Sequence, residues 1–272
     1  MKQYLNLVDT VLNKGIKRTN RTGVDTLMYF GYHYKVNLQK GYPLLTTKKV
    51  FFNSVIRELL WYLTGETHIR NLRKHTKIWD AWTNENKNWE IGKMYGYQWV
   101  KWEKFIEDPN TGEIKKTFIN QVDEVINLIK NNPDSRRMVV TAWNPAVLDQ
   151  IALPSCHAFF IFNVSNGRLN CHLTQRSGDI ALGIPFNLAC YATLTQMMAQ
   201  DANLELGEFS HYINDAHIYV NHIDGLKQQL ERTPYELPKL VIEKKPFWKL
   251  QFDDFSLLDY KHHPVIKFPV AV

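Results

Sequence analysis

The 272-residue sequence lacks several features that would point to a location outside the cell interior. It has no apolar stretch typical of a membrane protein, and the opening segment MKQYLNLVDTVLNKG mixes charged and apolar residues, unlike a signal peptide. Only three cysteines are present, far apart, which fits a reducing compartment better than a disulfide framework. We therefore expect a cytoplasmic protein with no membrane partner.

Motifs for common cofactors and metals are also missing. The sequence contains no internal repeat and no glycine-rich phosphate loop. His217, Tyr219 and His222 are not spaced like a zinc motif, so we expect no metal. Any chemistry must then depend on ordinary side chains and on bound substrates.

The overall composition is 44% hydrophobic and 22% charged, which is typical of a globular chain with a well-packed core. The net charge of +6 indicates an anionic partner, either nucleic acid or a phosphorylated small molecule, or else a solvated basic surface. The notable arginines lie in short polar loops and not in a basic stripe with stacking aromatics. Nucleic acid is therefore not the expected primary partner.

Apolar periodicity and turn residues predict an α+β fold, with a large mixed β-sheet packed against long helices. Residues 1–272 are expected to form a single domain, within which residues 66–120 make a smaller, looser polar lobe around the loop EDPNTGE. The dipeptide Asn166-Gly167 predicts a tight hairpin. The expected helices cover residues 2–14, 53–63, 121–131, 186–200 and 217–231, and the expected strands 25–37, 137–143, 157–165, 168–175, 240–243 and 255–260.

Cys156 is the candidate nucleophile. It stands in ALPSCHAFF, where a loop enters a β-rich run, a position at which reactive groups are commonly displayed. A thiol needs a cationic neighbour to become a thiolate, and the predicted hairpin returns Arg176 beside it. A cysteine before a strand is more often a core residue, so both interpretations stay open. Cys171 and Cys190, in apolar surroundings, are interpreted as small core hydrophobes.

Three further kinds of residue are candidates for a site. Arg21 in TNRTGV and the paired arginines in PDSRRM suit a phosphate, although each could equally be a surface arginine. Glu58 lies on an apolar helix face and is a candidate acid or base, unless it pairs with Arg57 or points outward. Asn187 could be a helix N-cap or could read the edge of a base.

Taken together, these stretches resemble the thymidylate synthase family from Arg21 to Val272. The motifs that carry the resemblance are RTG at 21–23, TTKK at 46–49, REL around Glu58, IWD at 78–80, SRR at 135–137, LPSCH at 153–157, QRSGD at 175–179, LGIPFN at 182–187, DAHIYVNH at 215–222 and the terminal PVAV.

The resemblance implies a homodimer that methylates dUMP to dTMP, with 5,10-methylenetetrahydrofolate giving both the carbon unit and the hydride. Cys156 would add to C6 of the uracil and leave after C5 has been alkylated. The catalytic residues that it implies are Cys156, Glu58, Tyr95, Arg176, Asp179 and Asn187.

The resemblance also implies two binding regions. The dUMP site would use Arg21, Arg136, Arg137, Gln175, Arg176, Ser177, Asp179, Asn187, His217 and Tyr219, with Arg136 and Arg137 reaching in from the partner subunit. The folate site would use Trp79, Trp82, Asp179, Leu182, Gly183, Phe186, Ala271 and Val272.

A dUMP hydroxymethylase is the alternative activity. In that reaction water, not hydride, captures the methylene intermediate. Asn187 favours uracil over cytosine, and the tryptophans and the apolar tail favour exclusion of water. The sequence therefore favours the synthase.

Overall fold

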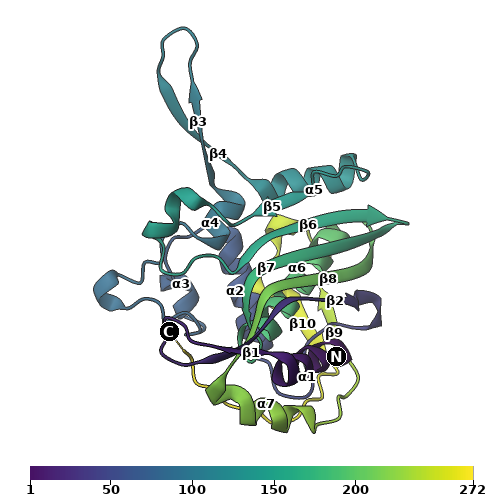
Figure 1. Cartoon of the computed structure of the whole chain (residues 1–272). Helices are drawn as coiled ribbons and strands as arrows, with labels where there is room; N and C mark the ends of the chain where they lie inside the picture. The colour runs from purple at the N-terminus through teal and green to yellow at the C-terminus, as the bar shows by residue number, and fades with distance from the viewer. Residues whose placement is uncertain (272) are drawn as a thin grey trace.

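The computed structural model describes residues 1–271 and shows a mixed α+β architecture, with a large sheet packed against helices (Figure 1). The predicted fold class is confirmed. The helices and strands are α1 Lys2–Lys14, β1 Ile16–Arg18, β2 Thr26–Asn37, α2 Phe52–Thr64, α3 Arg70–Arg73, α4 Tyr95–Val100, β3 Trp102–Glu107, β4 Ile114–Ile119, α5 Gln121–Asn131, β5 Val139–Thr141, β6 His157–Ser165, β7 Arg168–Asp179, α6 Gly183–Asp201, β8 Glu205–Tyr219, α7 Ile223–Leu230, β9 Lys239–Ile242 and β10 Phe255–Leu258.

Six strands form the main sheet in the order β1-β2-β8-β7-β6-β5. All neighbours are antiparallel except β7 and β8, which run parallel and therefore end at the same edge. The hairpin predicted at Asn166-Gly167 joins β6 to β7. Both residues have positive φ angles, 50° and 71°, as a two-residue turn requires. The hairpin pairs His157 with Gln175 and so brings the segment around Cys156 back to Arg176.

Helix α6 forms the centre of the core, as its sequence predicted. It is buried on nearly all sides and packs against β7 and β8. Pro185 is tolerated because it lies in the first turn, where a missing N–H breaks no bond within the helix. The helix begins at Gly183, earlier than expected, so Asn187 lies inside it. The interpretation of Asn187 as an N-cap is therefore wrong.

The segment after α6 differs most from the prediction. We expected a helix over residues 217–231, but β8 continues to Tyr219, a short 3-10 turn follows, and α7 covers only Ile223–Leu230. Strand β8 was not predicted at all. It is hydrogen-bonded on both sides, to β2 and to β7, and these long-range ladders decide its conformation over local helical spacing.

The two faces of the sheet differ. Phe160 and Phe162 of β6 point into the core and are buried, whereas the alternate residues Phe159 and Ile161 are only half-buried. Val139, which pairs with Ile161, is 39% exposed. Part of the second face of the sheet is thus apolar and accessible.

Strands β3 and β4 form a separate hairpin that stands away from the rest of the molecule (Figure 1). The loop predicted at residues 107–113 is confirmed as its tip, although the two flanking strands were not foreseen. Within residues 1–271, no helix is both long and apolar enough to cross a membrane.

Candidate active site

Cys156 lies where the loop enters β6, as the sequence predicted. Its backbone N–H donates to Tyr95 Oη at 2.7 Å, and its carbonyl accepts from the backbone N–H of Arg176 at 2.9 Å. The residue is half-buried, whereas Cys171 and Cys190 are fully within the core, and all three are free thiols. Cys156 is therefore the thiol that a substrate can reach, and its backbone is held in place.

The guanidinium of Arg176 lies against this thiol. Its Nη2 is 3.6 Å from Cys156 Sγ and also donates to the carbonyl of Pro154 at 2.7 Å, while Nε donates to the carbonyl of Ser155 at 3.1 Å. Burial raises the pKa of the Cys156 thiol, and the charge of Arg176 opposes that rise without cancelling it. The sequence placed Arg176 correctly, but ionising the thiol needs a contribution beyond this one cation.

Tyr95 is positioned by strained backbone. Its φ is 26°, rare for an aromatic residue and a conformation that costs about 1–3 kcal/mol. The next residue must be Gly96, because a Cβ there would lie 2.0 Å from the carbonyl oxygen of Tyr62. The Tyr95 ring stacks on His157 at 4.2 Å between centroids. This packing holds the Tyr95 hydroxyl beside Cys156.

Glu58, on α2, is buried with 7% of its surface exposed. Trp79 Nε1 donates to its Oε1 at 2.7 Å. Arg57 instead covers the ring of Phe252, so the interpretation that Glu58 pairs with Arg57 or faces solvent is wrong. Burial raises the pKa of Glu58 to about 7, against the hydrogen bonds from Trp79 and Tyr62. Such a carboxyl can give or take a proton near neutral pH.

Asn187 lies on α6, 9% exposed, with both ends of its amide engaged. Its Oδ1 accepts from Gln175 Nε2 at 3.1 Å, and its Nδ2 lies 3.1 Å from His157 Nε2. An amide oxygen has two lone pairs and an amide nitrogen two hydrogens. One acceptor and one donor position therefore remain for a ligand.

The parallel ends of β7 and β8 bring further predicted residues together. Ser177 is in register with Asp215, and Asp179 with His217. Asp179 Oδ1 accepts from the backbone N–H groups of the turn that leads into α6, at 2.8 and 3.2 Å. Burial lowers the pKa of His217, but its 2.8 Å contact with Asp215 and the charge of Asp179 raise it by more, giving a net rise.

The remaining predicted polar residues fall into two groups. Tyr219 lies beside His217, with 5.3 Å between the ring centroids. Burial raises the pKa of both Tyr219 and Cys156, and the charge of Arg21 partly opposes that rise. Arg136 and Arg137 are exposed just before β5, at the edge of the main sheet. All three arginines are exposed, and of them only the charge of Arg21 acts on the thiol.

The residues predicted for the second substrate fall into two groups, a tryptophan pair and the start of α6. The rings of Trp79 and Trp82 are 5.2 Å apart, with Trp79 buried and Trp82 half-buried. Leu182, Gly183 and Phe186 lie half-buried around the start of α6. Aromatic and apolar surface at this position suits a flat ring system.

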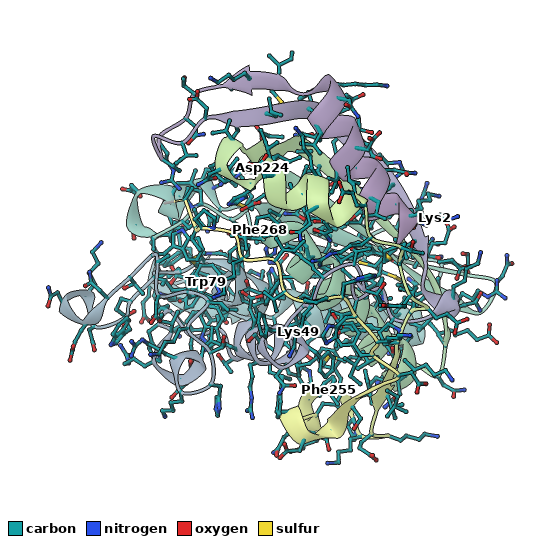
Figure 2. All side chains as sticks on the ribbon, turned by 90° about the horizontal axis from the view of Figure 1, so that it is seen from below. Lys2, Lys49, Trp79, Asp224, Phe255 and Phe268 are labelled. Carbon is teal, nitrogen blue, oxygen red and sulfur yellow. The ribbon has the colours of Figure 1, made fainter. Side chains whose placement is uncertain are left out.

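The C-terminal segment is anchored close by. His222 Nε2 lies 2.7 Å from the carbonyl oxygen of Pro269, and the Phe268 ring lies 4.6 Å from Lys48 Nζ. Figure 2 shows Phe268 between α7, marked by Asp224, and the segment marked by Lys49. Ala271 is half-buried, and the prediction for Val272 lies outside the described residues.

The thymidylate synthase family model matches residues 2–272, essentially the whole chain. The chain belongs to the thymidylate synthase family. In this family member the candidate nucleophile, the Arg176 guanidinium and the Asn187 amide come from the loop before β6, from β7 and from α6, which the fold brings together. Among residues 1–271, no group of three or more His, Cys, Asp or Glu side chains is arranged to hold a metal ion.

Sequence reasoning missed two histidines of this site. His157 was part of the LPSCH motif but received no role, although it bonds Asn187 and stacks on Tyr95. His211 is fully buried and bonds Gln175. The alternation of Phe209, His211 and Ile213 on one face of β8 was the available signal, because it puts a polar residue among core positions. Recognising it required the strand to be predicted first.

Glu58→Gln is expected to stabilise the protein at alkaline pH. The Glu58 carboxyl ionises near pH 4.5 in the unfolded protein and near pH 7 in the folded protein. Its contribution to the free energy of unfolding is therefore fully present below pH 4.5 and is lost as the pH rises through 7. Glutamine keeps a hydrogen-bond acceptor for Trp79 but carries no charge. Its free energy of unfolding should exceed that of the wild type by up to about 3 kcal/mol at pH 8, and by little at pH 4. Urea titrations at both pH values measure this.

Glu103→Gln provides a control of opposite sign. Glu103 accepts hydrogen bonds from Lys116, Lys93 and Tyr97, which lower its pKa to about 2. A carboxylate whose pKa is lower in the folded than in the unfolded protein stabilises the fold at pH values above its unfolded pKa. Glu103→Gln should therefore be less stable than the wild type at pH 8. An effect of Glu58→Gln that is the same at pH 4 and pH 8 would contradict the burial argument.

Proposed function

We propose that this chain is a thymidylate synthase, which converts dUMP to dTMP with 5,10-methylenetetrahydrofolate as the second substrate. Family membership over the whole chain supports this proposal. The observation that carries it is the reachable Cys156 thiol, 3.6 Å from the Arg176 guanidinium, in the site where Asn187 keeps one donor and one acceptor position free. That combination suits covalent attack on a uracil ring whose polar edge is held.

In the proposed reaction Cys156 adds to C6 of uracil. The C5–C6 electron pair moves toward C5 and O4, and C5 becomes nucleophilic. Asn187 donates to O4 and accepts from N3–H, which stabilises the charge on O4. The folate supplies the one-carbon unit and the hydride. Glu58 exchanges a proton with the O4 side through water, Tyr95 takes part in removing the C5 proton, and Cys156 then leaves.

The proposed nucleotide site follows from the same residues. Arg21, Arg176 and Ser177 hold the phosphate, for which guanidinium forks and hydroxyl donors are suited. Gln175 and the backbone of Asp179 border the base, while His217 and Tyr219 bond the deoxyribose hydroxyl. The raised pKa of His217 supports a role as a hydrogen-bond donor.

The proposed folate site lies beside it. Trp79, Trp82, Leu182, Gly183 and Phe186 present the aromatic and apolar surface that a pteridine ring requires. Asp179, whose Oδ1 accepts from the turn that leads into α6, belongs to this proposed site as well. The C-terminal tail, up to Ala271, closes over the bound pair and excludes water, which favours capture by hydride.

We further propose a homodimer in which Arg136 and Arg137 complete the phosphate site of the partner subunit. The accessible apolar face of the sheet, including Phe159, Ile161 and Val139, supports such an interface. The exposure of both arginines at the sheet edge supports their use by a second copy.

Mixing two inactive variants tests this arrangement. Cys156→Ser and the double variant Arg136→Gln/Arg137→Gln should each have little activity alone. After subunit exchange at equal amounts, half of the dimers are mixed, and each mixed dimer has one complete site. Activity should therefore recover to about a quarter of the wild-type value. No recovery, despite exchange demonstrated by mass spectrometry, would show that both groups act within one subunit.

One reaction tests the proposed activity itself. The protein is incubated with dUMP and 5,10-methylenetetrahydrofolate, and both the folate and the nucleotide products are identified. Dihydrofolate with dTMP is the expected result. Tetrahydrofolate with hydroxymethyl-dUMP would identify a hydroxymethylase instead, and unchanged dUMP would remove both activities.

A further inference from the structure

The chain approaches its C-terminus as a segment without regular secondary structure, residues 263–269, which we call the tail strap. Two hydrogen bonds fix its beginning. The backbone N–H of His263 donates to the carbonyl of Thr46 at 2.8 Å, and Arg232 Nη1 donates to the carbonyl of Pro264 at 2.8 Å. The start of the tail strap is therefore tied to the body of the protein.

The end of the tail strap is held by a seat for the Phe268 ring. Phe268 is half-buried, although its neighbours Lys267 and Pro269 are exposed. Lys48 Nζ lies 4.6 Å from the centroid of the Phe268 ring, and the His222 ring meets it edge to face with 5.1 Å between centroids. The ring is therefore held by groups from two segments that are far apart in the sequence.

Gly225 makes the room for this ring. It lies inside α7, where glycine is among the least favoured residues because it has the most backbone freedom to lose. A Cβ at this position would lie 2.6 Å from Phe268 Cε1 and 3.0 Å from Ile266 Cγ2. The first distance is too short for two carbon atoms, so any side chain here would push the ring out of its seat. The tail strap that covers α7 thus explains a glycine that the helix by itself disfavours.

His222 holds the backbone of the tail strap beside the ring. It is fully buried, and its Nε2 lies 2.7 Å from the carbonyl oxygen of Pro269. A carbonyl oxygen can only accept, so Nε2 carries the hydrogen and donates it. The other ring nitrogen, Nδ1, lies 3.8 Å from Asp179 Oδ1. His222 therefore lies between the tail strap and a residue of the proposed folate site.

We propose that Gly225 and His222 are positioning residues, which hold Phe268 and Pro269 in a preformed seat and so fix the point from which the end of the chain closes over the substrates. This inference rests on the proposed function, because closure has a role only if nucleotide and folate bind together. Beyond the seat, Val270 is 54% exposed, so the seated part of the tail ends at Pro269.

The seat matters for binding because closing a tail that is already anchored loses less conformational entropy than closing a free one. When Phe268 leaves the seat, the tail must be ordered again before it can hold the folate. The apparent affinity for the folate therefore falls in proportion to the fraction of molecules whose seat is filled. Binding of dUMP alone is different, because none of its proposed contacts comes from the tail strap.

Gly225→Ala tests the seat. If the added methyl group keeps Phe268 displaced for about nine-tenths of the time, KM for 5,10-methylenetetrahydrofolate should rise about tenfold. The Kd for dUMP, measured without folate, should stay close to the wild-type value. An equal loss of affinity for both substrates would mean that the substitution only damages the fold, and no change in either would mean that the seat is not needed. Both results would overturn the proposal.

Shortening the ring should rescue this variant. Leucine at position 268 lacks the Cε1 and Cζ atoms, which lie 2.6 and 3.2 Å from the position of a Gly225 Cβ. Gly225→Ala/Phe268→Leu should therefore recover most of the folate affinity that Gly225→Ala loses. Gln228→Ala is the matched control, because Gln228 is an exposed residue of the same helix, and it should leave both substrates unaffected. Losses that simply add in the double variant would contradict the size match.

The bond to the Pro269 carbonyl is tested separately. His222→Leu removes the donor, whereas His222→Gln keeps an N–H group that can reach the same carbonyl. KM for the folate should rise about tenfold in the leucine variant, as expected for losing one buried hydrogen bond. It should rise by much less in the glutamine variant. Equal effects of the two substitutions would show that the bond does not position the tail.

His222 also gives a readout that does not depend on catalysis. Nitrogen-15 NMR of the ligand-free protein labelled at histidine should show His222 protonated at Nε2, with slow exchange of that hydrogen. Exchange should be about tenfold faster in Gly225→Ala, because the seat opens more often, and slow again in the double variant. An exchange rate that Gly225→Ala leaves unchanged would overturn the proposal. Slow exchange in a protein that turns over no dUMP would support the seat and reject the proposed function.

Discussion

Cys156→Ser should lower turnover of dUMP by about 10⁴-fold or more, because a hydroxyl is a far weaker nucleophile at neutral pH than a thiolate. The rest of the site should survive, since the Tyr95 and Arg176 contacts described above use the Cys156 backbone as well as its sulfur. Binding of dUMP should therefore change much less than kcat. Steady-state kinetics together with equilibrium binding separate the two effects.

The covalent step gives a second measurement on the same variant. With 5-fluoro-dUMP and the folate, the wild-type protein should gain the mass of a stable adduct, and Cys156→Ser should not. Cys190→Ala is the control, because Cys190 is buried in α6 and lies outside the proposed machinery. It should still form the adduct. Peptide mapping that finds the adduct on Cys171 or Cys190 would refute the assignment of the nucleophile.

Asn187→Asp should lower kcat/KM for dUMP by about 100-fold or more and give measurable turnover of dCMP. A carboxyl group at this buried position holds its proton most readily when the unprotonated N3 of cytosine faces it. Protonated, it can donate to N3 of cytosine and accept from the 4-amino group. Ionised, it has no donor for O4 of uracil. Sites built to hydrogen-bond a substrate discriminate strongly when a donor and an acceptor are exchanged.

Asn187→Ala separates specific pairing from general damage. It removes the amide without supplying a carboxyl, so it should lose dUMP activity and gain none with dCMP. Asn187→Asp keeps an oxygen that can accept from Gln175, whereas Asn187→Ala loses the contacts with both Gln175 and His157. An aspartate variant that keeps the full preference of the wild type for dUMP would show that Asn187 does not select the base.

The features that the sequence predicted well depend on neighbours in the chain. The Asn166-Gly167 turn is decided by two residues that tolerate positive φ, and together with the register shift between His157 and Phe159 it places Arg176 beside Cys156. Helix α6 was predicted because its residues are apolar on all sides. The ordered motifs by themselves indicate the family.

The errors arose where distant segments decide the outcome. Helical spacing over residues 217–231 was overruled by strand pairing with β2 and β7. The sequence allowed Glu58 to pair with the adjacent Arg57. In the structure Glu58 instead bonds Trp79, and Arg57 covers the ring of Phe252, both of which are distant in sequence. Local patterns contain no information about such contacts.

The sequence by itself determined the fold class, the hairpin and the family, and it supplied the residues that are proposed for the site. Only the tertiary structure decided the state of those residues. Burial outweighs Arg176 at the Cys156 thiol and raises the pKa of Glu58 to about 7. The Ser177 carbonyl fixes the direction in which Gln175 and Asn187 point. A pKa and an amide orientation depend on the groups that surround a side chain in space, and those groups come from strands and helices far apart in the sequence.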